Sequence, residues 1–163
     1  MRSERGSAGA GFALMLIVLA LSASLLDIYS LATAKAWADR VCQEASLVAV
    51  STARDLAAYV QTGRVRVDPD VADQVAREVV ALRAQQRGYQ YSVQVEVLEE
   101  GGSVPGFPPA GSILGRDFAG NDPAVGVYLE VEVPTAFMKA LGLGNATRVH
   151  AFAASSLSSA RRS

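Results

Sequence analysis

The feature that most constrains this chain is a long uncharged stretch near its N-terminus. No charged side chain occurs from Ser7 to Leu26, and residues 12–20 (FALMLIVLA) are almost purely aliphatic. About 20 apolar residues in a helix cross the ~30 Å hydrocarbon core of a bilayer. A helix also satisfies its own backbone hydrogen bonds in lipid. We therefore expect residues 7–27 to form a transmembrane segment.

The charges around this stretch indicate its orientation. Arg2 and Arg5 lie in a short polar leader, residues 1–6. Basic residues before a membrane span favour a cytoplasmic N-terminus. The sequence thus predicts a single-pass protein of the cell membrane, with the lipid bilayer as a partner and the C-terminal domain outside the cytoplasm.

Two other interpretations of the apolar stretch remain open. It could belong to a cleaved secretory signal, since small-x-small sites follow at residues 32–34 (ATA) and 34–36 (AKA). However, the apolar run is longer than most signal cores, and the helical pattern continues through both sites. It could also be a buried helix of a soluble protein, but the remaining chain hardly supplies the core that this would need.

The overall composition weakens several classes of function. Hydrophobic residues make up 50% of the 163 residues, charged residues 19%, and the formal net charge is −1. No basic stripe is present to neutralise phosphates, so nucleic acid is not an expected partner. One cysteine and one histidine make a poor metal site, and we expect no cofactor, no metal and no catalytic residue.

The helical pattern continues past the membrane segment. No Gly or Pro occurs between Phe12 and Val60, so the sequence predicts one rod that ends at Thr62–Gly63. Its second half, residues 28–62, is amphipathic and must pack on the C-terminal domain or on neighbouring copies. The predicted apolar face consists of Leu31, Ala34, Val41, Ala45, Val48, Thr52, Leu56 and Val60.

A second helix and a small sheet are predicted in the rest of the chain. Asp68 can cap a helix that begins at Pro69, and Gly88 stops it. Its predicted apolar stripe is Val71, Val75, Val79 and Leu82. Period-two alternation predicts strands over residues 89–98 and 125–133 and a weaker strand over 147–155, with a short helix over 134–143 and a long loop over 101–123.

The predicted fold class is therefore α+β. A long N-terminal transmembrane and amphipathic helix is followed by a second helix and a small, mostly antiparallel β-sheet. The extracytoplasmic α+β domain covers residues 63–156, and residues 157–163 form a flexible tail. The order of the strands is left open.

Asp27 is the first charge after the apolar run. It is either an interfacial residue at the outer end of the span or an intramembrane polar contact with a partner. Small residues let helices approach closely in lipid, and Ala20 and Ser24 belong to a small-residue patch before Asp27. We therefore predict Ala20, Ser24 and Asp27 as membrane-packing residues.

A few other polar residues invite a functional interpretation. Cys42 on the amphipathic rod is either a packed thiol or a partner in an intermolecular disulfide. His150 on a predicted strand favours a structural role over a catalytic one, because no nucleophile motif accompanies it. Four carboxylates near the long loop are either solvated or a cation site without regular calcium-loop spacing; they are Glu99, Glu100, Asp117 and Asp122.

Several short segments resemble one family in the right order. They are Arg5-Gly6-Ser7 followed by Phe12-Ala13-Leu14, then residues 25–29 (LLDIY), 41–49 (VCQEASLVA), 131–137 (VEVPTAF) and 149–153 (VHAFA). Together they resemble the TadE/TadG family of minor pseudopilins of tight-adherence (Flp-type) pili. The resemblance implies a pilin-like fold, a homo- or hetero-oligomeric assembly, and other pilin or assembly-platform subunits as partners.

The resemblance also draws attention to the start of the apolar helix. The family has a glutamate before Phe-Ala-Leu, and Gly11 stands there in this chain. Gly11–Phe12 resembles a prepilin-peptidase junction, where cleavage follows a glycine. Cleavage between Gly11 and Phe12 is therefore a hypothesis, and N-terminal sequencing tests it.

The resemblance implies a non-enzymatic, membrane-anchored minor pilin-like subunit of a pilus or secretion assembly. An alternative from another class is a single-pass accessory subunit of a membrane complex, whose outer domain binds protein; the glycine at position 11 favours it. A secreted enzyme after signal cleavage is a third interpretation, but it lacks a catalytic constellation.

Overall fold

The computed structural model describes residues 4–109, 117–142 and 144–157, with side chains from residue 11 onward. The predicted leader therefore lies partly outside the described residues, and the predicted tail lies outside them except for Leu157. The elements in chain order are α1 (Glu4–Thr52), α2 (Leu56–Thr62), α3 (Pro69–Arg87), β1 (Gln90–Leu98), β2 (Gly102–Val104), β3 (Phe118–Gly120), β4 (Ala124–Pro134), α4 (Ala136–Ala140) and β5 (Ala146–Ser156). The α+β class and its pilin-like arrangement are confirmed.

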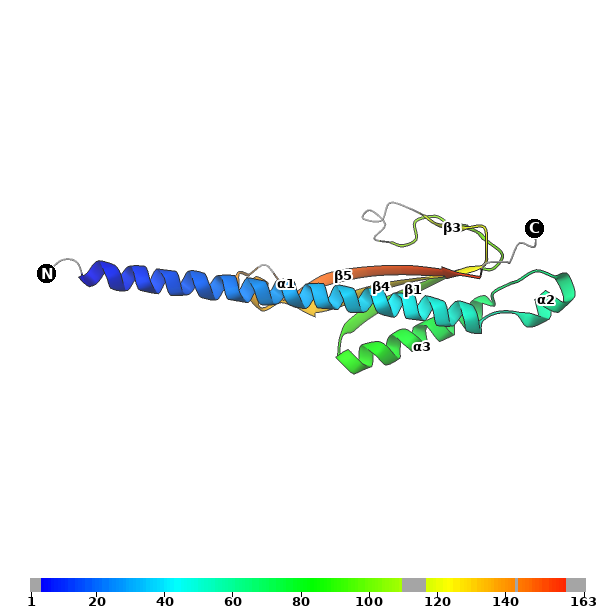
Figure 1. The fold of residues 1–163 in the computed structure, drawn as a ribbon, viewed down its shortest axis with the longest axis horizontal. Helices are drawn as coiled ribbons and strands as arrows, with labels where there is room; N and C mark the ends of the chain where they lie inside the picture. The colour runs from blue at the N-terminus through cyan, green and yellow to red at the C-terminus, as the bar shows by residue number, and fades with distance from the viewer. Residues whose placement is uncertain (1–3, 110–116, 143, 158–163) are drawn as a thin grey trace.

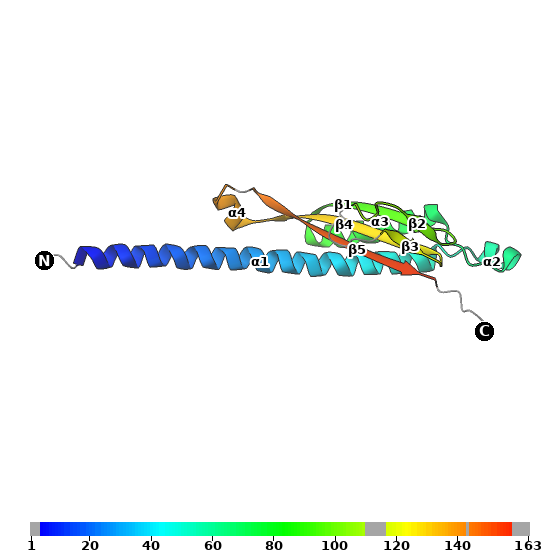
Figure 2. The same cartoon turned by 90° about the horizontal axis from the view of Figure 1, so that it is seen from above.

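Helix α1 dominates the shape of the molecule. Its 49 residues make a rod of about 70 Å, at about 1.5 Å per residue. Its first half projects beyond every other element, and its second half lies along the sheet (Figures 1 and 2). The expected rod with an uncovered first half and a packed second half is therefore present.

The rod is shorter than predicted, because α1 ends at Thr52 rather than continuing to Thr62. Arg54 forms an isolated antiparallel bridge with Val67, and the Asp55 N–H donates to the carbonyl of Arg66 at 3.0 Å. Asp55 then caps α2, since its carboxylate accepts the Ala58 N–H at 2.9 Å. The break needs neither Gly nor Pro, because a capping carboxylate and a distant segment hold the backbone out of the helix.

Helix α3 has the predicted ends. The Asp68 carboxylate accepts the N–H groups of Asp70 and Val71, Pro69 is the first helical residue, and Gly88 ends the helix in the left-handed conformation. Its buried side chains are Ala72, Ala76, Val80 and Ala84. The predicted stripe was partly wrong: Val75 and Val79 are half-buried, but the ends of that stripe, Val71 and Leu82, are exposed.

Strand β4 is the centre of a three-stranded antiparallel sheet of order β1–β4–β5. In the register, Val127 lies opposite Val95 on one side and Ala153 on the other. Helices α1 and α3 cover one face of this sheet, and the β2–β3 hairpin lies over the other (Figure 1). The turn between β4 and β5, which contains α4, points toward the N-terminal half of α1 (Figure 2).

The core between α1 and the sheet pairs small side chains with larger ones. The buried line on α1 consists of Ala34, Ala38, Val41, Cys42, Ala45, Ala49 and Val50, and it faces Val127, Leu129 and Val131 of β4. Small residues on the helix let it approach the branched side chains of the sheet closely. The predicted face was wrong beyond Ala45, since Val48, Thr52, Leu56 and Val60 are exposed.

The predicted long loop over 101–123 contains the β2–β3 hairpin and a second small core. Phe107, Phe118 and Phe152 meet edge to face, with ring centroids 5.6–6.1 Å apart. Gly126 of β4 lies beneath them, and a Cβ there would come 3.0 Å from the Phe107 ring and 3.1 Å from the Phe118 ring. The rings of the aromatic cluster would therefore have to shift to admit a side chain at position 126. Residues 110–116 of the loop lie outside the described part.

Candidate functional site

The carboxylate of Asp27 joins α1 to α4. Its Oδ1 accepts the Ala136 N–H at 2.9 Å, and its Oδ2 accepts the N–H groups of Phe137 and Met138 at 2.9 and 3.2 Å. Asp27 is only 7% exposed. The intramembrane interpretation of Asp27 expected a partner subunit, whereas its partner in the structure is a distant segment of the same chain.

Asp27 acts as the N-terminal cap of α4, although it belongs to a distant helix. The first N–H groups of a helix have no partner within it, and an N-terminal carboxylate also complements the helix dipole. Thr135 occupies the cap position but makes no side-chain capping bond, and its Oγ1 has no hydrogen-bond partner within the described residues. The ordering of α4 therefore depends on Asp27 of α1.

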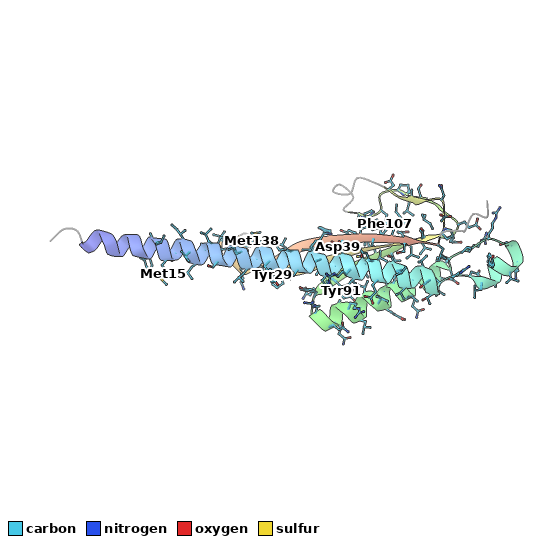
Figure 3. The ribbon with its side chains drawn as sticks, in the orientation of Figure 1. Met15, Tyr29, Asp39, Tyr91, Phe107 and Met138 are labelled. Carbon is cyan, nitrogen blue, oxygen red and sulfur yellow. The ribbon has the colours of Figure 1, made fainter. Side chains whose placement is uncertain are left out.

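The face of α1 that meets α4 is lined by small residues. Ala23 and Ser24 precede Asp27 by one helical turn and are half-buried, whereas their neighbours Leu21 and Leu25 are exposed. Residues three and four apart share a helix face, so Ala23, Ser24 and Asp27 form one line toward α4. Figure 3 shows Met138 of α4 beside the stretch of α1 that carries Tyr29. Of the predicted membrane-packing residues, only Ala20 is left without this cover, because its side chain is exposed.

The first half of α1 is exposed on all sides. Apart from Ala23 and Ser24, every side chain from Gly11 to Leu26 is exposed, and the most apolar window has a mean hydropathy of 2.3 with 6% of its residues buried. Within the described residues, α1 is the one helix long and apolar enough to cross a membrane. Gly11 and Phe12 both lie inside this helix and are exposed, so the hypothetical peptidase junction falls within the uncovered part of α1.

The two small-x-small sites of the signal-peptide interpretation share Ala34, which belongs to the folded core. Ala34 is fully buried, and Trp37 just beyond packs on Tyr89 with ring centroids 5.1 Å apart. Cleavage after Ala34 would remove Asp27 and the contacts of Leu31 with the core. The structure thus favours an intact α1 in the folded protein.

Cys42 is a packed thiol. It is fully buried beneath the sheet, and burial, with a smaller contribution from Asp39, raises its pKa to about 12. A buried, protonated thiol is a poor nucleophile for disulfide exchange. The intermolecular-disulfide interpretation of Cys42 is therefore disfavoured by the fold.

An ion pair ties α1 to α3. The Arg83 guanidinium donates from Nη2 to Glu44 Oε1 at 2.6 Å and from Nε to Glu44 Oε2 at 3.1 Å. This two-point contact with Glu44 raises the pKa of Arg83. The sequence analysis missed both residues, because 39 positions separate them and nothing in the local pattern links them.

His150 has structural partners on the outer face of the sheet. Its Nδ1 lies 2.7 Å from the hydroxyl of Tyr128 and 3.8 Å from a carboxylate oxygen of Glu130. Burial and then the charge of Glu130 raise the pKa of Tyr128. The arrangement matches the structural role expected for His150.

Two of the four carboxylates near the long loop, Asp117 and Glu100, bind neighbouring segments. Asp117 accepts the Gly106 N–H at 3.1 Å, and Glu100 forms ion pairs with Arg64 and Arg66. Glu99 accepts the Val67 N–H through its backbone carbonyl at 3.4 Å. In the ranges that the structure describes, no group of three or more His, Cys, Asp or Glu side chains is placed to hold a metal ion.

Comparison of the chain with protein-family models, with curated proteins and with solved structures gives no match. The distinctive feature is the change at Asp27, where an uncovered apolar helix becomes a helix covered by its own domain.

Proposed function

We propose that the protein is a membrane-anchored, non-enzymatic pilin-like subunit. Residues 7–27 of α1 span the bilayer, and the sheet domain lies outside the cytoplasm. The observation that carries the proposal is the division of α1 at Asp27: side chains before it are almost all exposed and apolar, whereas after it one face of the helix packs on β4 and β5. Exposed apolar surface of this length on a helix is stable in lipid but not in water.

The shape of the chain supports an assembly role. A rigid rod whose outer half is buttressed by a sheet and by the Glu44–Arg83 pair presents the domain at a fixed distance from the membrane. Its exposed half is free to pack against other apolar helices, as small and aliphatic residues do in lipid. The resemblance to TadE/TadG pseudopilins points in the same direction, to a pilus or a secretion assembly with other pilin or platform subunits.

Three polar side chains that stand out in the sequence have structural positions within the fold. Asp27 binds α4, Cys42 is buried, and His150 contacts Tyr128. These assignments support a positional mechanism, in which the domain makes protein contacts while helix packing holds the subunit in place.

One sequence observation favours a second candidate. Gly11 stands where the family has a glutamate that assists subunit docking. A single-pass accessory subunit, whose outer domain binds a partner within a membrane complex, does not need that glutamate.

Shearing of cells that express the full chain separates the two candidates. A pilin-like subunit is expected in the sheared filament fraction, or in the membrane with its N-terminus removed up to Gly11. An accessory subunit is expected at full length and only in the membrane. Normal piliation, adhesion and secretion after deletion of the gene would contradict the pilin-like role.

A further inference from the structure

Helix α4 lies at the depth where the apolar part of α1 ends. From Ser7 to Leu26, α1 has 20 residues, which cover the ~30 Å of a hydrocarbon core. Asp27 follows directly and holds the N-terminus of α4 at this level. If α1 spans the bilayer as proposed, α4 is therefore at the outer membrane–water boundary.

The surface of α4 is apolar and partly uncovered. Phe137 and Met138 are only half-buried although they belong to a short helix against α1, and Leu141 is 56% exposed. Residues 136–142 (AFMKALG) contain one charged side chain, the exposed Lys139. A cluster of apolar side chains with a flanking lysine is the composition of a segment that binds a lipid surface.

Apolar side chains of α1 are also exposed at the level of α4. The four residues around Asp27 expose most of their side chains: Leu25 at 65%, Leu26 at 69%, Ile28 at 62% and Tyr29 at 70%. Aromatic residues with a polar end, such as Tyr29, are enriched at the membrane–water interface. A lipid surface would cover both these four side chains of α1 and the side chains of α4 at once, whereas a small ligand would not.

We propose that Phe137, Met138 and Leu141 form an interfacial patch that inserts into the headgroup region of the outer leaflet, with Lys139 extending to the lipid headgroups. This proposal rests on the proposed function, because it requires that α1 span the bilayer. The patch adds a second contact with the membrane beside α1. Since interfacial anchors set the tilt and rotation of a span, the patch fixes which side of the sheet domain faces the membrane.

Tryptophan fluorescence in lipid vesicles tests the patch. Trp37 is the chain's one tryptophan, so the full-length Trp37→Phe variant has no tryptophan fluorescence and serves as the background for single tryptophan substitutions. Leu141→Trp reports on the patch, Leu21→Trp on the proposed span, and Leu56→Trp on α2, which is far from α4 and offers a matched leucine with 63% exposure. Each variant is reconstituted in phosphatidylcholine–phosphatidylglycerol vesicles, with or without bromine atoms on the acyl chains close to the headgroups.

We expect brominated lipid to quench the emission of L141W and L21W and to leave that of L56W unchanged. Quenching of L21W without quenching of L141W would overturn the patch and leave the membrane span standing. The absence of quenching in both would overturn the span and the patch together. An L141W emission that responds to the protein-to-lipid ratio but not to bromine would show contact with another copy of the chain, and would also overturn the lipid proposal.

Discussion

The Asp27 carboxylate accepts the backbone N–H of Phe137 at 2.9 Å, although 110 residues separate them in the chain. The contact joins the end of the apolar half of α1 to the turn between β4 and β5. It makes the helix and the sheet domain one unit at the level where the chain is proposed to leave the membrane. The position of α4 relative to α1 therefore depends on a single buried carboxylate.

Replacing Asp27 by Asn should loosen α4. The amide keeps one acceptor oxygen but loses the negative charge and one of the two accepting atoms. Hydrogen bonds to charged groups contribute about 1.5–3 kcal/mol each, so we expect a loss of about 1–3 kcal/mol in local stability. Hydrogen exchange at the amides of Ala136, Phe137 and Met138 measures it.

The matched control for this substitution is Asp39→Asn on the same helix. Asp39 pairs with the exposed Lys35, and exposed ion pairs are typically worth less than about 1 kcal/mol. Exchange at the three α4 amides should be unchanged in D39N. Equal protection in D27N and the parent protein would show that Asp27 does not hold α4.

The small residues on the buried face of α1 should be intolerant of larger side chains. Ala45 is fully buried against the sheet, so Ala45→Leu forces the helix away from β4 and should destabilise the domain by about 1–3 kcal/mol. Ala36→Leu, on the exposed face of the same helix, is the control and should change stability by less than about 0.5 kcal/mol. Thermal unfolding in detergent compares them, and similar melting temperatures for the two variants would contradict the packing.

Gly126 should be required for the aromatic cluster over the sheet. An Ala methyl at this position would approach the rings of Phe107 and Phe118 within 3.0–3.2 Å, so Gly126→Ala should cost about 1–3 kcal/mol. At Gly120 the nearest atoms to an added Cβ are 3.8 Å away, so Gly120→Ala is a control with little expected effect. Near-ultraviolet circular dichroism measures the loss of aromatic packing. A G126A spectrum identical to that of the parent protein would show that the added methyl does not disturb the rings.

The thiol of Cys42 should make stability fall at high pH. Its pKa is raised from 9.0 to about 12 in the folded protein, so the unfolded chain loses the proton first. The stabilisation is fully present below pH 9 and is lost as the pH rises toward 12. The stability difference between the parent protein and Cys42→Ala, measured across this range, should follow that course. A pH-independent difference would contradict the burial of the thiol.

Cys42 should also resist chemical modification in the folded state. At pH 8, iodoacetamide should react slowly with the native protein and rapidly after unfolding in guanidinium, because the thiolate is the reactive form. Non-reducing electrophoresis should show a monomer. A disulfide-linked dimer would restore the intermolecular interpretation of this residue.

Local signals in the sequence were sufficient for much of the fold. Asp68, Pro69 and Gly88 act on their own neighbours, so the ends of α3 could be predicted from them. The outer strands β1 and β5 alternate because one face packs against the helices and the other is more exposed, whereas β4 is buried on both faces. The three predicted strands match β1, β4 and β5 within one residue at each end.

Long-range contacts explain what could not be predicted. The end of α1 at Thr52 depends on the bridge between Arg54 and Val67. The buried face of α1 depends on which of its residues pack against the sheet. Alanines carry most of that face, and alanine does not distinguish a buried position from an exposed one. The partner of Asp27 could not be predicted either, because 110 positions separate Asp27 from Phe137 and no local pattern links them.

The most direct test of the proposed anchor is the intact mass of the chain recovered from membranes washed at alkaline pH. The wash removes peripheral proteins and leaves spanning helices in the pellet. The account predicts that the chain stays in the pellet with a mass that includes every residue from Phe12 to Ser163, with or without the segment before it. Recovery of the chain in the supernatant would contradict the anchor. So would a mass that corresponds to a chain cleaved after Ala34 or Ala36.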